Sequence, residues 1–295
     1  MSKFSASTLC CCLVIALGAP LIGACASMQN GAASEAERAT AADTALSVAI
    51  AGDWRDPKNA ARDRYRHPLE TLTFFGVDAK QTVVEITPGG GGWYSEILAP
   101  YLRDGGQYIA AQVDPAAVPE GRSRDGQQKT IDTLKARLAA HPAQFDRARI
   151  ATFDPKQPVF AAPGSVDTLL TFRNVHNWVA GGTADAYFAA FFAALKPGGT
   201  LGIVDHRAKP GTDLETMKKS GYLTEAMVIE LATKAGFELE ARSEINANPK
   251  DTADHPNGVW TLPPTNRHDP EEAQKYQAIG ESDRMTLRFR KPARD

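Results

Sequence analysis

The residues best suited to chemistry form a glycine-rich turn at residues 87–92, which reads Thr-Pro-Gly-Gly-Gly-Gly. The β-branched segment before it, residues 82–87, predicts a short strand, and residues 93–102 predict a helix with one apolar face. Glycines in such a turn can adopt positive φ and let the backbone approach a ligand, while the start of the helix offers unpaired N–H groups. The turn therefore predicts a site for a polar ligand of nucleoside size.

The spacing of these glycines argues against a dinucleotide site. In the fingerprint G-x-G-x-x-G, a glycine should follow Gly89 and Gly91 at the position that Tyr94 occupies. An NAD-dependent oxidoreductase is therefore disfavoured.

Polar and basic residues gather where two later strands are predicted to end. Residues 173–178 (RNVHNW) follow a strand predicted at 166–172, and Asp205-His206-Arg207 ends a strand predicted at 200–205. Ligands of open α/β sheets bind outside the carboxyl ends of the strands. We therefore expect both groups of residues to face a ligand.

Three histidines are candidates for a general base, because imidazole titrates near neutral pH. His176 is the first, His206 with Asp205 is the second, and His67 is the third. A hydrogen-bonded structural role is the alternative for each. Arg173 either binds an anionic acceptor or pairs with an acid.

Strand-like and helix-like segments alternate from residue 82 onwards, which is the order that generates a parallel sheet with right-handed crossovers. The predicted strands are 82–87, 108–113, 149–153, 166–172, 200–205, 237–245 and 285–290, and the main predicted helices are 93–102, 130–140, 184–195 and 225–235. A short helical piece at 59–75 is broken at His67-Pro68. The long insertion at about 246–280 is rich in proline and asparagine and contains Trp260. We interpret it as a partly packed lid.

The run of Glu85, Gly89, Gly90 and Gly91 resembles the acidic-x-Gly-x-Gly-x-Gly motif of class I S-adenosylmethionine-dependent methyltransferases. The first glycine of that motif is Thr87 in this sequence. Residues 195–199 (LKPGG), before the fifth strand, are also typical of these enzymes. Residues 66–68 (RHP) and 85–94 resemble most closely a group of predicted bacterial, exported methyltransferases.

The resemblance implies an α/β, Rossmann-like class I methyltransferase fold, with a seven-stranded, mostly parallel sheet, helices on both faces and strand order 3-2-1-4-5-7-6. It implies S-adenosylmethionine as the cofactor, with Asp114 at the ribose hydroxyls and Asp154 near the adenine. The implied cofactor-binding residues are Glu85, Thr87, Gly89, Gly90, Gly91, Tyr94, Asp114, Asp154, Arg173 and Asn174. The expected catalytic residues are His176, His206 and Asp205, and the expected substrate-binding residues are His67, Arg173 and Trp178. Methyl transfer is an in-line displacement, so alignment matters more than side-chain chemistry.

The first 25 residues predict export. Lys3, an apolar run over residues 9–23 and small residues at its end are typical of a secretory leader. Residues 22–25 (IGAC) resemble a bacterial lipobox, although residues 24–26 also fit ordinary signal peptidase. We favour a periplasmic lipoprotein anchored through lipidated Cys25 over a soluble periplasmic product. A flexible tether over residues 26–52 and a methyltransferase-like domain over residues 53–295 would follow.

Composition and net charge argue against some classes of ligand and partner. All four cysteines lie within the first 25 residues, so the domain has no thiol for a disulfide or a zinc site, and we expect no metal centre. The net charge of -2, without long runs of Lys or Arg, disfavours a nucleic-acid partner. We expect a small-molecule or envelope-associated acceptor. Because S-adenosylmethionine is made in the cytoplasm, the alternative is a non-catalytic exported binding lipoprotein that keeps the fold.

Overall fold

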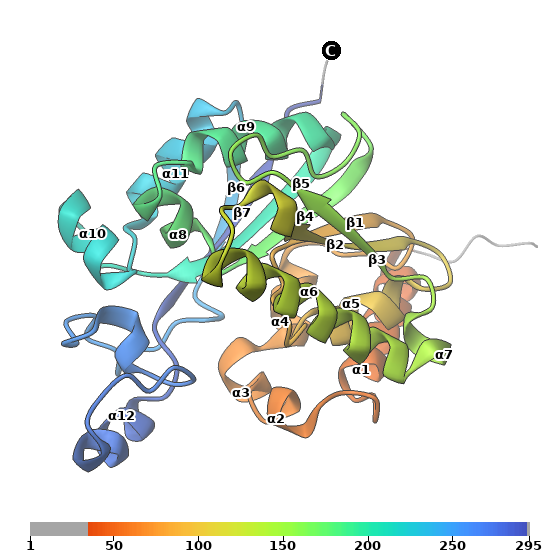
Figure 1. The fold of residues 1–295 in the computed structure, drawn as a ribbon. Coiled ribbons are helices and arrows are strands. Elements are labelled where there is room, and N and C mark those ends of the chain that lie inside the picture. The colour runs from red at the N-terminus through yellow and green to blue at the C-terminus, as the bar shows by residue number, and fades with distance from the viewer. Residues whose placement is uncertain (1–34, 294–295) are drawn as a thin grey trace, which may run out of the picture.

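A seven-stranded sheet lies at the centre of the computed structural model, which describes the backbone of residues 35–293 and the side chains of residues 43–293 (Figure 1). The strand order is β3-β2-β1-β4-β5-β7-β6. Neighbours from β3 to β5 are parallel, and β7 runs antiparallel between β5 and β6. The fold class and the strand order expected from the sequence are both confirmed.

The strands match the predicted segments closely. They are β1 (Thr82–Ile86), β2 (Gln107–Val113), β3 (Arg149–Phe153), β4 (Val166–Phe172), β5 (Leu195–His206), β6 (Glu238–Ser243) and β7 (Arg284–Arg290). The largest difference is at β5, which begins at Leu195 because that residue already pairs with Val166 of β4.

Most of the helices surround the sheet. The α-helices are α1 (Glu35–Ile50), α2 (Pro57–Ala60), α3 (Asp63–Arg66), α4 (Pro68–Phe74), α5 (Ser95–Leu102), α6 (Arg122–Ala140), α7 (Pro142–Phe145), α8 (Val175–Ala180), α9 (Ala184–Ala194), α10 (Leu214–Ser220), α11 (Glu225–Lys234) and α12 (Ala273–Ile279). Three 3-10 helices are η1 (Pro115–Ala117), η2 (Gly258–Thr261) and η3 (Pro270–Glu272). The Thr224 side chain accepts a hydrogen bond from the Met227 N–H and so caps α11.

The two faces of the sheet bury separate apolar layers. Val84 packs in the layer that includes α8, α9 and α11, whereas its neighbour Val83 packs in the layer that includes α1, α4, α5 and α6 (Figure 1). Successive side chains of a strand point to opposite faces, so a central strand that is covered on both sides buries both sets of side chains and is mostly apolar. Glu85 therefore shares the face of Val83 and lies within the protein.

Helix α1 corrects one expectation from the sequence. Residues 26–52 were expected to form a flexible tether, but residues 35–50 are helical, and Leu46 and Ala49 of this helix are buried against α4 and α5. The segment is rich in alanine, which favours a helix, and two buried apolar residues suffice to dock it. The predicted leader, Cys25 and the first part of the tether lie outside the described residues. Within residues 35–293, no helix has both the length and the apolar character that crossing a membrane requires.

The insertion between β6 and β7 is packed against the rest of the domain. Gly258, at φ 56°, lies so close to the backbone of Ser220 that a Cβ atom would overlap it. The Tyr222 hydroxyl donates to Asp251 (2.9 Å), and Asp251 also contacts His255 (2.8 Å). These contacts hold the insertion next to the carboxyl edge of the sheet. Its role as a lid stays a prediction.

Candidate functional site

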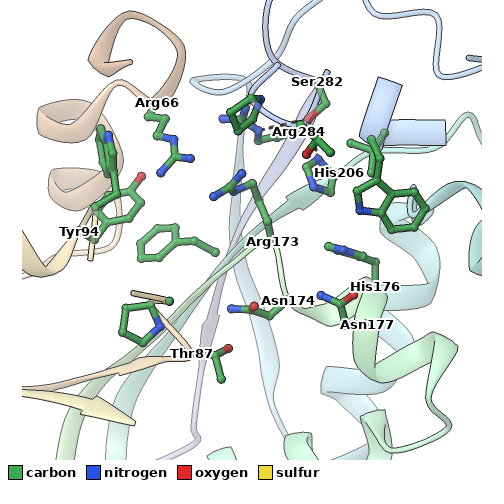
Figure 2. Close-up of a pocket in the computed structure, with 18 of the residues that line it drawn as sticks. Arg66, Thr87, Tyr94, Arg173, Asn174, His176, Asn177, His206, Ser282 and Arg284 are labelled. Carbon is green, nitrogen blue, oxygen red and sulfur yellow. Dashed lines mark hydrogen bonds between the residues drawn. The ribbon is translucent and has the colours of Figure 1, made fainter. Parts of the chain in front are cut away.

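A cavity of about 310 Å³ lies where the carboxyl ends of β1, β4 and β5 meet the insertion. The turn after β1, the segment after β4, the end of β5 and residues 259–265 of the insertion all contribute to its walls (Figure 2). This is the place where open α/β sheets bind ligands.

The turn after β1 keeps the conformation of a glycine turn even where the sequence has threonine. Thr87 lies in the left-handed region at φ 46°, and its N–H donates to Ala111 of β2 (2.8 Å). A β-branched residue rarely adopts this conformation, which costs about 1–2 kcal/mol. Such strain is typical of functional sites, where surrounding contacts enforce it.

The glycines of the turn have different surroundings. A Cβ atom on Gly89 or Gly91 would meet no protein atom within 4 Å, so these positions leave room for a ligand. Gly90 packs against Thr133 of α6 instead, where a Cβ atom would lie 3.1 Å away. Of the predicted glycines, Gly89 lines the cavity, while Gly90 and Gly91 do not.

Glu85 lines the inner wall of the cavity and is only 2% exposed. Its carboxylate accepts hydrogen bonds from the Tyr108 hydroxyl (2.6 Å) and the Ser95 hydroxyl (3.4 Å). Burial raises the pKa of Glu85 to about 7, although these hydrogen bonds and the nearby Arg66 favour the ionised form. The acid of the turn motif is therefore close to half-ionised at neutral pH.

An aromatic pair forms another wall. The ring of Tyr94, just before α5, stacks on Phe172 at the end of β4 with 3.6 Å between the ring centroids. Trp93 packs edge-on against Tyr94 at 4.5 Å. Burial raises the pKa of Tyr94, so this hydroxyl stays protonated. These rings can contact an apolar or aromatic part of a ligand.

His176 and Asp205 form a buried pair. The Nδ1 atom of His176, in the first turn of α8, lies 2.9 Å from Asp205 Oδ1 at the end of β5. Asp205 also accepts hydrogen bonds from the backbone N–H groups of His206 (2.8 Å) and His176 (3.3 Å). With Nδ1 bound to the carboxylate, Nε2 is the free base, a tautomer that we assign from these contacts.

His206 lies beside this pair but has a different partner. Its Nδ1 atom is 2.6 Å from the Ser282 hydroxyl, and its ring centroid is 5.0 Å from that of His176. Burial, together with His176 and nearby arginines, lowers the pKa of His206 well below its usual value, so the ring is neutral. The expected pairing of the His206 ring with Asp205 is wrong, because Asp205 holds the ring of His176.

The group of His176, Asp205 and His206 also has the donor types of a metal centre, with ligand atoms within 4.8 Å of one another. The sequence analysis expected no metal centre. The charges nearby are positive, since Arg173 and Arg284 both act to lower the pKa of His206. A divalent cation would be repelled by these arginines, and we therefore interpret the group as a base with its orienting carboxylate.

The other predicted residues divide into those that line the cavity and those that do not reach it. Arg173 and Asn174 line the cavity, and the Asn174 amide donates to the Ile86 carbonyl (2.9 Å), which links the end of β4 to β1. Asp114 and Asp154 lie at the ends of β2 and β3 but outside the cavity walls, where each accepts a backbone N–H two residues ahead at 2.8 Å. His67 joins α3 to α4 and does not line the cavity either.

Trp178 corrects another expectation. It is 6% exposed and stacks on Tyr187 of α9 with 4.3 Å between the ring centroids, so it belongs to the core instead of a substrate site. Residues i and i+2 of a helix point in different directions, and Trp178 lies two positions after His176.

Several lining residues were not predicted as site residues. Arg284 and Ser282 reach the cavity from the start of β7, and Trp260 reaches it from the insertion. Arg66 was noted only as part of a motif. Among these residues, only Trp260 had a local signal, as a tryptophan in a proline-rich insertion. Arg284 and Ser282 can be placed at the cavity only once β7 is known to lie between β5 and β6.

Comparisons with known proteins agree with this architecture. No protein-family model matches the sequence, and no curated protein matches it. Among solved structures, the chain is similar to an S-adenosylmethionine-dependent methyltransferase from Aquifex aeolicus, at 13% identity and a TM-score of 0.52, over 84% of this chain and 98% of that one. It is similar to the cyclase SpnF, at 16% identity and a TM-score of 0.52, over 88% and 96% of the two chains. A third is a putative sarcosine dimethylglycine methyltransferase from Galdieria sulphuraria, at 12% identity and a TM-score of 0.50, over 80% and 88%.

These likenesses concern the fold. The chain has the Rossmann-like fold of class I methyltransferases. Because a cyclase is among the similar structures, the fold alone does not identify the reaction.

Proposed function

We propose that this protein is an S-adenosylmethionine-dependent methyltransferase that acts on a small-molecule acceptor. One observation carries the proposal: a single cavity brings the glycine turn after β1 next to the His176–Asp205 pair. The turn supplies a place for the cofactor, and the pair supplies a base for the acceptor.

The residues around the turn suit the cofactor. The open space above Gly89 and Gly91 leaves the backbone accessible, and the left-handed Thr87 preserves the shape that a glycine would give. Asp114 lies outside the walls of the cavity, but it ends β2, which pairs with β1, so it would reach the ribose hydroxyls of a cofactor that extends along the glycine turn. When bound, S-adenosylmethionine would supply an electrophilic methyl group, whose bond to sulfur breaks as the acceptor is methylated and leaves S-adenosylhomocysteine.

The chain's own residues would then align the acceptor and remove its proton. Asp205 fixes the ring of His176 so that Nε2 can take a proton from the acceptor as its heteroatom bonds to the methyl carbon. Trp260 and Pro263, from the insertion, line the cavity, where they would limit access of water. Positive charge on His176 after this step would be stabilised by Asp205.

Calorimetric titration of the purified protein with S-adenosylmethionine and S-adenosylhomocysteine tests the cofactor assignment. We expect Asp114→Ala to weaken binding by about 10- to 100-fold, which is what loss of hydrogen bonds to a charged group costs. Asp213→Ala is the matched control, because Asp213 also accepts an N–H at the start of a short helix but does not follow a strand that pairs with β1. Absence of binding at millimolar ligand to the folded protein would remove the cofactor claim.

Export and lipid anchoring are a separate proposal that rests on the sequence of residues 1–25. Cell fractionation of the tagged chain should find it in the membrane fraction, and Cys25→Ser should shift it to the soluble periplasm. An unchanged distribution of this variant would contradict lipidation.

A further inference from the structure

Four arginines lie around a single buried carboxylate, that of Glu281, and three of them (Arg66, Arg173 and Arg284) line one end of the cavity. Arg62 Nε donates to Glu281 Oε1 (2.6 Å), and Arg284 donates to Glu281 Oε2. Arg66 Nε lies 3.6 Å from the same carboxylate, which is 2% exposed. Figure 2 shows Arg66, Arg173 and Arg284 pointing toward one another across the cavity.

Glu281 neutralises only part of this positive charge. Burial alone would raise the pKa of Glu281, but Arg284, Arg66 and Arg62 more than offset burial and lower it to about 2. The carboxylate is therefore ionised, and together with the partly ionised Glu85 it balances only part of the charge of the four arginines. Burying unpaired cations is unfavourable, so the group is incomplete without a further anion.

Two of the arginines have guanidinium groups without full partners. Arg66 is 3% exposed, and its Nη2 atom has no hydrogen-bond partner among the described residues. Arg173 lines the cavity, and within residues 43–293 its side chain makes no hydrogen bond or ion pair. Burial, followed by the charge of Arg284, lowers the pKa of Arg173 to about 10, so it still carries its charge at neutral pH.

The position of Arg173 connects this group to the base. Its backbone has φ 62°, and its N–H donates to Val204 of β5 (2.7 Å), which fixes the segment after β4. The side chain lies between Tyr94 and His206 in the view of Figure 2. His176 follows three residues later, so an anion bound at Arg173 would lie in the same cavity as the free base.

We propose that Arg66, Arg173 and Arg284 bind a phosphate or carboxylate group of the methyl acceptor, which directs the acceptor's nucleophile toward His176. The guanidinium fork suits both groups, since it can donate two parallel hydrogen bonds to their oxygens. Tyr94 and Trp260 add aromatic walls that suit an organic body attached to the anion. The methyl-transfer part of this inference rests on the proposed function, whereas the anion site does not.

Calorimetry with four probes in low-salt buffer tests the anion site. The probes are phenyl phosphate, benzoate, inorganic phosphate and the neutral benzyl alcohol. We expect phenyl phosphate and benzoate to bind at least about 10-fold more tightly than benzyl alcohol. Equal affinity for benzyl alcohol would overturn the anion site. Phenyl phosphate binding no tighter than inorganic phosphate would contradict an organic acceptor.

Arg173→Gln is the informative variant, because the Arg173 side chain makes no bond that the fold depends on. We expect it to weaken the binding of phenyl phosphate by about 10- to 100-fold. The affinity of Arg173→Lys should lie between that of Arg173→Gln and that of the wild type. Arg149→Gln, at the exposed start of β3, removes the same charge far from the cavity and should leave affinity unchanged. Unchanged affinity of a folded Arg173→Gln protein would overturn the assignment.

A competition experiment separates the acceptor from the cofactor. We expect phenyl phosphate to bind equally well with and without S-adenosylhomocysteine. Displacement of phenyl phosphate by that ligand would assign the arginines to the cofactor carboxylate and contradict an acceptor site. Binding of phenyl phosphate without binding of S-adenosylhomocysteine would contradict the proposed function but not the anion site. Binding of S-adenosylhomocysteine without binding of phenyl phosphate would contradict the anion site but not the proposed function.

Discussion

Replacing Glu85 with glutamine should change how the stability of the protein depends on pH. Glu85 is buried and has a pKa raised from 4.5 to about 7. Between these values the folded protein holds a proton that the unfolded chain has released. The free energy of unfolding therefore falls as pH rises from about 4.5 to about 7, and the penalty is complete above that range.

The size of the effect follows from the shift. Each pKa unit corresponds to about 1.4 kcal/mol, so ionised Glu85 opposes folding by about 3 kcal/mol at pH 8. Glutamine keeps an oxygen that can accept from Tyr108 and Ser95 but does not ionise. Between pH 5 and pH 8 we expect the stability of Glu85→Gln relative to the wild type to increase by about 2–3 kcal/mol.

Urea unfolding at several pH values measures this difference directly. Glu238→Gln is the matched control, because Glu238 is an exposed carboxylate on a strand. The free energy of unfolding of this variant should change with pH in parallel with that of the wild type. Parallel curves for Glu85→Gln would refute the assignment of a raised pKa to the buried acid of the turn motif.

Three other perturbations test the account. Trp178→Ala should lower the free energy of unfolding in urea by about 3–5 kcal/mol without changing the affinity for phenyl phosphate, because the ring lies in the core. Weaker phenyl phosphate binding with little loss of stability would instead support a place for Trp178 in the substrate site. Gly258→Ala should speed proteolysis within the insertion by forcing a Cβ atom into the Ser220 backbone, whereas Gly211→Ala, also at positive φ but in open space, should not; equal rates would mean that the insertion is not held by this contact. The ring of His206 should titrate in NMR well below pH 6.5, because burial favours its neutral form. Since the unfolded chain binds that proton near pH 6.5, His206 lowers the free energy of unfolding as pH falls below that value. An NMR midpoint near 6.5 would contradict its buried placement.

The sequence was most informative where local patterns and burial coincide. The apolar run at 166–172 became β4 with the predicted bounds, because a central strand of a covered sheet is apolar on both faces. The run at 149–153 became β3, also with the predicted bounds, at the edge of the sheet. Helix α1 was missed because a segment of small and charged residues is compatible with either a linker or a helix, and burial of Leu46 decides between them.

The candidate site was only partly predictable for a different reason. Thr87, Tyr94 and His176 follow strands whose order could be inferred, so their convergence was expected. Arg284 is 111 positions after Arg173 in the sequence, and it reaches the cavity only because β7 pairs antiparallel with β5. No periodicity within either segment indicates that contact.

The central claim is that the turn at residues 87–92 holds the nucleoside of the cofactor. Hydrogen–deuterium exchange of the protein with and without S-adenosylhomocysteine tests it most directly, because backbone N–H groups that bind or are covered by a ligand exchange more slowly. We predict slower exchange in residues 87–94 and in the segment after β4, residues 173–178. Slower exchange confined to other parts of the chain, or none at saturating ligand, would contradict the claim.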